Sequence, residues 1–234
     1  MPVPDGLAAT PENLAQARAC QEELARRVET IDRLTPPAWV AGADVHYPRD
    51  DHEARAAVVL LTFPGLELVE TATARLPSPF PYRSGYLSFR EAPAVLAALA
   101  GLSRPPDLLF LDGQGLAHPR GLGLACHVGV QSGLPTIGVA KSRLVGDYQE
   151  PGPHRGDQSP LTYRGVVVGA VLRTRDRVRP LFVSPGHRVS LATALAYTLA
   201  CHEGFREPRP LRLAHQAASR LCGRGRGAEE KNRR

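Results

Sequence analysis

The stretch 106–119 constrains the fold of this chain more than any other part of the sequence. Residues 108–111 form a short apolar run, which predicts a strand that is buried on both faces. The run ends on Asp112, and a turn with Gly113 and Gly115 follows it. Asp is disfavoured in strands and costly to bury alone, so this placement predicts a carboxylate that points into the ligand crevice of an α/β sheet. Taken alone, the stretch fits equally well a turn aspartate that bonds its own backbone.

A second predicted strand also carries a carboxylate near its end. Residues 39–47 are mostly apolar and hold Asp44 after three small residues, 41–43, which allow a neighbouring backbone to approach closely. Strand patterns follow at 54–63 and 66–74 with short turns between them, and this succession predicts an antiparallel meander. Two aspartates at two strand ends favour a functional site over an isolated turn residue.

Residues 135–140 form another buried strand, which ends on Lys141. A helix predicted over 122–133 joins it to the 108–112 strand, and such a helical crossover makes the two strands parallel. We therefore expect Lys141 level with the aspartates, either as their ion-pair partner or as a contact for a phosphate. Further predictions are helices over 10–34, 92–99, 190–201 and 209–222, a loop over 146–160, a hairpin of 166–173 with 179–183, and a turn over 184–188. The fold class is α/β, with a mixed sheet flanked by helices.

The net charge of +6 over 234 residues favours a polyanionic partner such as nucleic acid. The four cysteines form no C-x-x-C pair, which predicts free thiols and a cytoplasmic location. The apolar runs are too short and interrupted for a membrane span, so we expect no membrane partner. Length and apolar content predict one domain over 1–222, followed by a basic, disordered tail over 223–234.

Three carboxylates are candidates for one shared site. If the 39–47 strand is central and the 108–112 strand lies parallel beside it, Asp44 and Asp112 face each other. Glu91 lies at the start of the 92–99 helix, where it could reach the same crevice and where the helix dipole alone would also favour it. Carboxylates that converge repel one another and favour a divalent cation, and oxygen ligands indicate Mg²⁺ or Mn²⁺. Such an ion activates water against a phosphodiester, and Lys141 would neutralise charge that develops on the phosphate.

Five segments in this order resemble the endonuclease V family. They are Ala41-Gly42-Ala43-Asp44-Val45, residues 81–91 (PYRSGYLSFRE), residues 111–120 (LDGQGLAHPR), residues 138–142 (GVAKS) and residues 184–187 (SPGH). The resemblance extends from about residue 10 to about residue 222. It implies a ribonuclease H-like fold and a metal-dependent nuclease that recognises deoxyinosine, the product of adenine deamination, in DNA. It further implies hydrolysis of the second phosphodiester 3′ of the lesion, leaving a 3′-hydroxyl and a 5′-phosphate.

The resemblance also assigns roles to residues of the expected site. It implies that Asp44, Glu91 and Asp112 are catalytic carboxylates that bind Mg²⁺, with Mn²⁺ as the alternative cofactor. It places Lys141 beside the scissile phosphate and His215 near the metal. Inosine-containing DNA is the implied partner, inosine-containing RNA stays open, and we expect a monomer.

Two further regions follow from the resemblance. A wedge is implied at Pro81, Tyr82, Arg83 and Ser84, in which Tyr82 separates the strands where the altered base is turned out. The altered pair stacks and pairs poorly, so turning it out costs less than extruding a normal base. The expected lesion pocket comprises Gly113, Gly115, Leu116 and His118, in which backbone N–H donors of the first three would read the hypoxanthine oxygen. For His118, a structural role is an equal alternative.

Several other interpretations of the sequence stay open. A related ribonuclease H-like nuclease would cut inosine in RNA, mismatches or flaps with the same carboxylates, because one metal site cleaves any phosphodiester brought to it. A binding module without catalysis would be expected to lack one of the carboxylates, yet all three are present. A phosphatase would need an Asp-x-Asp nucleophile pattern, and Asp112-Gly113-Gln114 does not provide it.

Overall fold

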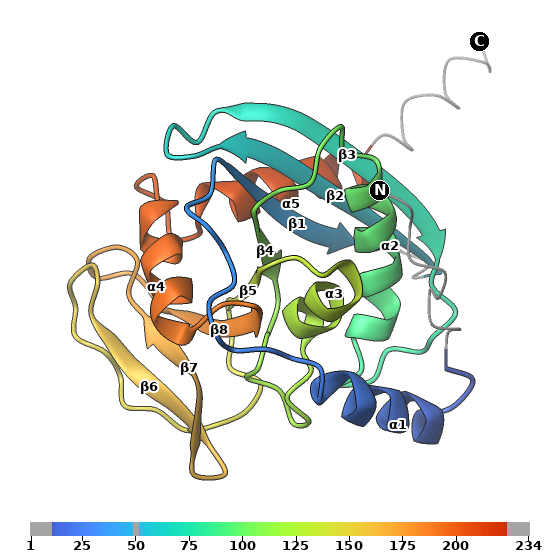
Figure 1. The fold of residues 1–234 in the computed structure, drawn as a ribbon, viewed down its shortest axis with the longest axis horizontal. Helices are drawn as coiled ribbons and strands as arrows, with labels where there is room; N and C mark the ends of the chain where they lie inside the picture. The colour runs from blue at the N-terminus through green and yellow to red at the C-terminus, as the bar shows by residue number, and fades with distance from the viewer. Residues whose placement is uncertain (1–10, 49–51, 224–234) are drawn as a thin grey trace.

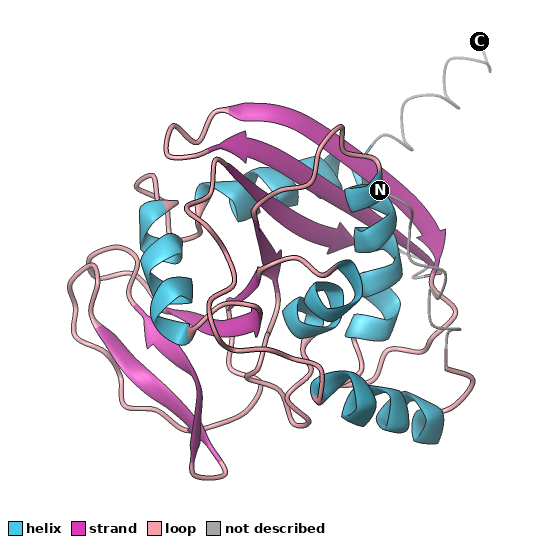
Figure 2. Ribbon diagram, in the orientation of Figure 1, coloured by secondary structure: helices cyan, strands magenta, loops and turns pink. Residues whose placement is uncertain are grey.

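The core of the protein is one mixed sheet of eight strands (Figures 1 and 2). The computed structural model describes residues 11–48 and 52–223. The strand order is β3-β2-β1-β4-β5-β8-β7-β6. The strands are β1 (Trp39–His46), β2 (Glu53–Thr62), β3 (Leu68–Pro77), β4 (Leu108–Asp112), β5 (Thr136–Ala140), β6 (Gln158–Tyr163), β7 (Val166–Leu172) and β8 (Leu181–His187).

The pairing directions confirm the predicted mixture of meander and crossover. Strands β1, β2 and β3 pair antiparallel in chain order, whereas β1, β4 and β5 are parallel neighbours. The helix α2 (Ser88–Ala100) connects β3 to β4, and α3 (Leu124–Ser132) connects β4 to β5. The carboxyl ends of β1, β4 and β5 therefore lie at the same edge of the sheet.

Helices cover both faces of the sheet, with α2 and α3 in front and α5 (Arg209–Gly223) behind in Figure 1. One core packs α2 and α3 against the side of β1 that carries Ala41 and Ala43. The other core packs α4 (Leu191–Ala200) and α5 against the side that carries Val40. Since strand side chains alternate, Asp44 lies on the α5 side of β1.

Gly42 brings α5 close to β1. A Cβ atom at this position would lie 2.2 Å from the backbone oxygen of Pro210, so any larger residue would push the start of α5 away from the strand. The close approach holds α5 along the same side of β1 that carries Asp44. It thereby sets the distance between Asp44 and the side chains of α5.

Three predicted elements differ from the structure. Helix α1 (Leu14–Ala25) ends well before residue 34, because residues beyond it pair instead with Arg188: the Arg33 N–H donates to the Arg188 carbonyl, and the Arg188 N–H to that of Glu29. Part of the predicted loop over 146–160 belongs to β6, an edge strand that pairs with β7. The predicted turn at 184–188 is mostly the end of β8, which a register shift opposite Thr136 accommodates.

The last helix also extends one residue past the predicted domain boundary, because α5 includes Gly223. The rest of the predicted tail, residues 224–234, lies outside the described residues. Within the described part of the chain, the helices lack the length and apolar character that crossing a membrane requires.

Candidate active site

Asp44 and Asp112 lie side by side at the carboxyl ends of two parallel strands. The register of β1 and β4 pairs Ala43 with Leu111, so the aspartates that follow these residues are neighbours. Asp44 is buried, and Asp112 keeps part of its side chain in solvent. The structure therefore brings the two strand-end carboxylates together.

Glu91 joins these aspartates from the first turn of α2. It is only 8% exposed although it carries a carboxyl group. Burial raises its pKa well above the ordinary value, and the charges of Asp44 and Asp112 raise it further. Burial likewise raises the pKa of Asp44, followed by the charge of Asp112, against a lowering hydrogen bond from His215. The three carboxyl groups therefore share one electrostatic site in which negative charge is disfavoured.

Lys141 forms an ion pair with a carboxylate of this site. Its Nζ lies 2.6 Å from Asp112 Oδ2 and 3.1 Å from Glu207 Oε2. Burial lowers the pKa of Lys141, but the hydrogen bonds and charges of Asp112 and Glu207 outweigh that effect, so the net pKa is raised. Of the two predicted roles, the ion pair with an aspartate is present in the structure. Glu207 was not predicted, because nothing in the sequence before α5 marks it.

His215 reaches Asp44 from α5, with 2.8 Å between its Nδ1 and Asp44 Oδ2. His46, which was not predicted, completes a group with these two residues. Its Nε2 lies 3.3 Å from Asp44 Oδ2 and 3.2 Å from His215 Nδ1. A sequence signal for His46 exists, because it is two residues after Asp44 on a strand and so lies on the same side of the sheet.

The residues of the site suit a divalent cation. Three carboxyl groups that repel one another gain a partner when a cation neutralises them. Imidazole nitrogens of His46 and His215 add ligands of the kind that transition metals accept. In the described structure, Asp44, His46 and His215 place one ligand atom each within 4.8 Å of the others.

The predicted wedge loop projects from the surface. Pro81, Tyr82, Arg83 and Ser84 are all exposed, and Tyr82 shows 67% of its surface to solvent. The loop is anchored just after these residues at Gly85. The Gly85 carbonyl accepts hydrogen bonds from Gln21 Nε2 at 2.9 Å, from Arg120 Nη2 at 2.6 Å and from the His118 ring at 3.0 Å. The exposed Tyr82 side chain therefore belongs to a loop whose end is held by hydrogen bonds at Gly85.

The predicted lesion-pocket residues are engaged in contacts within the protein. The N–H of Gly113 donates to Val139 O, that of Gly115 to Ser184 Oγ, and that of Leu116 to Pro185 O. These N–H groups must exchange partners before they can read a base. The role of all three in base recognition stays a prediction.

His118 has a structural contact in this conformation. Burial, then the charge of Arg120, lowers its pKa to about 4, although the bond to Gly85 opposes the shift. The ring is therefore neutral at pH 7 and holds the base of the wedge loop. A contact with the lesion or with a phosphate stays a prediction for this residue.

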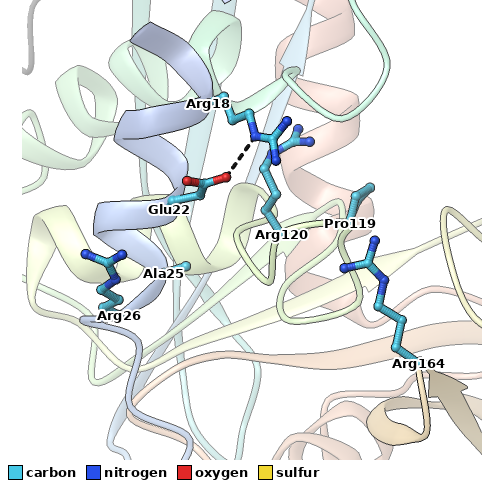
Figure 3. A pocket seen from close by; sticks show the side chains of 7 residues that line it. All are labelled: Arg18, Glu22, Ala25, Arg26, Pro119, Arg120 and Arg164. Atoms are coloured by element: carbon cyan, nitrogen blue, oxygen red, sulfur yellow. Dashed lines mark hydrogen bonds and ion pairs between the residues drawn. The ribbon is translucent and has the colours of Figure 1, made fainter. Parts of the chain in front are cut away.

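A basic pocket adjoins the wedge loop, between α1, the segment around Pro119 and the turn after β6 (Figure 3). Its polar lining consists of four arginines and one glutamate, and the full lining is Arg18, Glu22, Ala25, Arg26, Pro119, Arg120 and Arg164. Arg18 pairs with Glu22 at 2.8 Å, and Arg120 stacks over Tyr86, with 4.3 Å between its Cζ and the ring centroid. The excess of positive charge makes this surface suitable for an anionic partner.

Comparison with known proteins finds matches to endonuclease V along most of the chain. The family model described as Endonuclease V matches residues 22–216. The chain is 57% identical over 206 residues to endonuclease V of Azotobacter vinelandii, covering 88% of this chain and 93% of that protein. It is 49% identical over 210 residues to endonuclease V of Nostoc punctiforme, covering 89% and 95% respectively.

Solved structures give the same result. The crystal structure of endonuclease V from Streptomyces avermitilis is similar at a TM-score of 0.88 and 45% identity, covering 92% of this chain and 96% of that one. Endonuclease V of Ciona intestinalis, crystallised with a 23mer DNA containing an inosine followed by a ribo-adenosine, is similar at a TM-score of 0.78 and 28% identity. That match covers 89% of this chain and 96% of the Ciona chain.

Proposed function

Because the chain belongs to the endonuclease V family, and is therefore a nuclease, we propose that it recognises deoxyinosine in DNA and hydrolyses the second phosphodiester 3′ of the lesion with a divalent cation. The products would be a 3′-hydroxyl and a 5′-phosphate. The observation that carries the proposal is the convergence of Asp44, Glu91 and Asp112 beside Lys141 at one edge of the sheet. The inosine-containing DNA bound by the Ciona relative supports the choice of substrate.

The residues of the chain divide the reaction between them. Asp44, Glu91, Asp112 and His215 would hold the cation, Mg²⁺ or Mn²⁺, which supplies an activated water and Lewis-acid polarisation of the phosphate. The Lys141 side chain would move its ammonium from Asp112 to the scissile phosphate. There it would offset the negative charge that develops on the phosphate. Tyr82 would fill the gap left by the turned-out base, and we expect the enzyme to act as a cytoplasmic monomer.

Inosine in RNA is the second candidate substrate. The Ciona relative was crystallised in complex with a DNA strand in which a ribo-adenosine follows the inosine. The carboxylate site of this chain does not discriminate between the two, because it acts on the phosphodiester that both substrates share. Discrimination between DNA and RNA depends instead on contacts with the sugar. An assay on both substrates measures it.

The test is strand cleavage with Mg²⁺ on a labelled duplex containing one deoxyinosine, run beside an undamaged duplex and an inosine-containing RNA. The proposal requires a nick one nucleotide beyond the lesion that disappears in EDTA. Cleavage of the RNA alone would support the proposed active site but show that the substrate is RNA and not DNA. Cleavage that continues in EDTA would refute the role of the cation, and equal cleavage of the undamaged duplex would refute recognition of the lesion.

Replacing Tyr82 with alanine is expected to reduce discrimination between inosine and adenine duplexes by roughly 5- to 150-fold. The physical reason is the loss of about 1–3 kcal/mol of stacking, which the exposed ring can supply only once the base has been turned out. The measurement is the ratio of kcat/KM values on the two duplexes. Tyr82→Phe keeps the ring and should retain the ratio, whereas an unchanged ratio in Tyr82→Ala would refute the wedge.

Removing two arginines of the basic pocket is expected to weaken binding to any duplex and to flatten its salt dependence. Arg26 and Arg164 are exposed, and each arginine that no longer neutralises a phosphate should reduce the slope of log K against log salt by about 1. The measurement is the affinity of Arg26→Gln/Arg164→Gln for duplex DNA between about 50 and 200 mM salt. The control is Arg104→Gln, an exposed arginine that stacks on Trp39 before β4, at the other end of that strand from Asp112. If the slope of log K against log salt is the same for Arg26→Gln/Arg164→Gln as for Arg104→Gln, binding of phosphate at the basic pocket is contradicted.

A further inference from the structure

His46 is an imidazole beside the carboxylate site that the proposed function does not use. It follows Asp44 by two residues on β1, so the two side chains share the side of the sheet that faces α5. The His46 side chain is 28% exposed and that of His215 is 46% exposed, so both rings are reachable from solvent. The ring centroids lie 4.7 Å apart at an angle of 61°, which directs nitrogen toward nitrogen instead of stacking the rings.

The three ligand atoms form a nearly equilateral triangle. The separations are 2.8 Å for His215 Nδ1 to Asp44 Oδ2, 3.3 Å for His46 Nε2 to Asp44 Oδ2, and 3.2 Å for the two nitrogens. Ligand atoms about 2.0–2.2 Å from a shared ion are themselves about 2.8–3.6 Å apart, from octahedral to tetrahedral geometry. The triangle therefore has the size of one face of a coordination polyhedron.

Few protons are available to link these three atoms by hydrogen bonds. The two facing nitrogens and the carboxylate oxygen approach one another, and a neutral imidazole has only one N–H to share among such contacts. Ser219 Oγ lies 3.3 Å from His46 Nε2, which brings a further polar atom to the same ring nitrogen. A cation would satisfy both ring nitrogens and the carboxylate at once.

We infer that His46 is a metal ligand together with Asp44 and His215, and that the site consequently prefers a first-row transition ion over Mg²⁺. The inference rests on the proposed function only in that a divalent cation binds at these carboxylates. Mg²⁺ takes oxygen ligands and retains its water, whereas the affinity of a site with nitrogen ligands for first-row ions rises from Mn²⁺ to Co²⁺. Two nitrogens and one carboxylate form the type of ligand set that selects such ions.

The first experiment measures Mn²⁺ binding to the full chain by electron paramagnetic resonance, with Mg²⁺ as competitor. In the wild type, Mn²⁺ should bind more tightly than Mg²⁺. His46→Ala should weaken Mn²⁺ binding by about 10–100-fold, the usual size of the effect when a group that supports a metal site is removed, while Mg²⁺ binding changes by less than about threefold. The control is His154→Ala, which removes an exposed histidine from the loop before β6.

The second measurement includes a reading on the wild type, which does not depend on whether a variant folds. Nitrogen couplings to bound Mn²⁺ in the wild type should report two imidazoles, and His46→Ala or His215→Ala should each leave one. A single imidazole in the wild type, or equal weakening of Mn²⁺ and Mg²⁺ by His46→Ala, would overturn the inference. If that result comes with Mg²⁺-dependent cleavage of inosine DNA, the proposed function stands and only the role of His46 falls. If no divalent cation binds, both fall.

Discussion

Replacing Asp112 with asparagine is expected to lower the rate of inosine-strand cleavage by about 10³-fold, while the variant still binds the duplex. Asp112 ends β4 directly beside Asp44, and its charge is one of the causes that raise the pKa values of Asp44 and Glu91. Asparagine retains the shape but removes the charge that would hold the cation. The loss of several kcal/mol of charge stabilisation corresponds to a change of this size, since each 1.36 kcal/mol is tenfold.

Stability separates this effect from misfolding. The substitution relieves repulsion among three carboxyl groups and removes a partly exposed ion pair with Lys141, and such pairs contribute about 0–1 kcal/mol. The Tm of the metal-free variant should therefore stay within about 4 °C of the wild type. Binding of Mg²⁺ should raise the Tm of the wild type, and this increase should disappear in Asp112→Asn because the variant has lost a carboxylate that holds the cation.

The control for Asp112→Asn is Asp147→Asn, which changes a side chain that is 99% exposed. This control should retain both cleavage and the Mg²⁺-dependent increase in Tm. An Asp112→Asn enzyme that cleaves at the wild-type rate would refute the carboxylate site. A variant whose metal-free Tm falls by much more than the stated amount would show that Asp112 acts mainly in folding.

Side chains at strand ends are the residues whose positions could be predicted from the sequence. Asp44, Asp112 and Lys141 each follow an apolar run. The helical crossover identifies the Asp112 and Lys141 strands as parallel, whereas the parallel pairing of β1 with β4 was assumed and is found in the structure. Their proximity then follows from the geometry of a parallel sheet. The family resemblance added His215, whose approach depends on how α5 packs over Gly42 and so has no local sequence signal.

Residues that depend on tertiary contacts were missed. Glu207 reaches Lys141 because the chain before α5 crosses the end of β5, where Arg206 Nη2 also donates to the Lys141 carbonyl at 3.1 Å. Strand β6 escaped prediction because its residues are polar and include Pro160, as is common at a sheet edge. Helix α1 was predicted too long because the apolar period continues past Ala25, whereas backbone pairing with Arg188 takes over there.

Replacing Lys141 with methionine is expected to lower kcat by about 10²–10³-fold, the usual cost of removing one group that stabilises transition-state charge. Two explanations predict a decrease: Lys141 contacts the scissile phosphate, or it only compensates the charge of Asp112 at 2.6 Å. They differ in their response to the cation, because removing Lys141 frees Asp112 to bind it. The phosphate role therefore predicts tighter Mg²⁺ binding together with low kcat at every Mg²⁺ concentration.

The alternative predicts that saturating Mg²⁺ restores the rate, since the cation then takes the place of the ammonium beside Asp112. Glu207→Gln is the matched control, because it removes the second partner of Lys141, 3.1 Å away, and leaves the ammonium in place. Its kcat should stay within about tenfold of the wild type, because the ammonium still stabilises the transition state. Recovery of Lys141→Met at saturating Mg²⁺ would reduce Lys141 to a charge partner, and the phosphate would then have to be bound by another residue of the site.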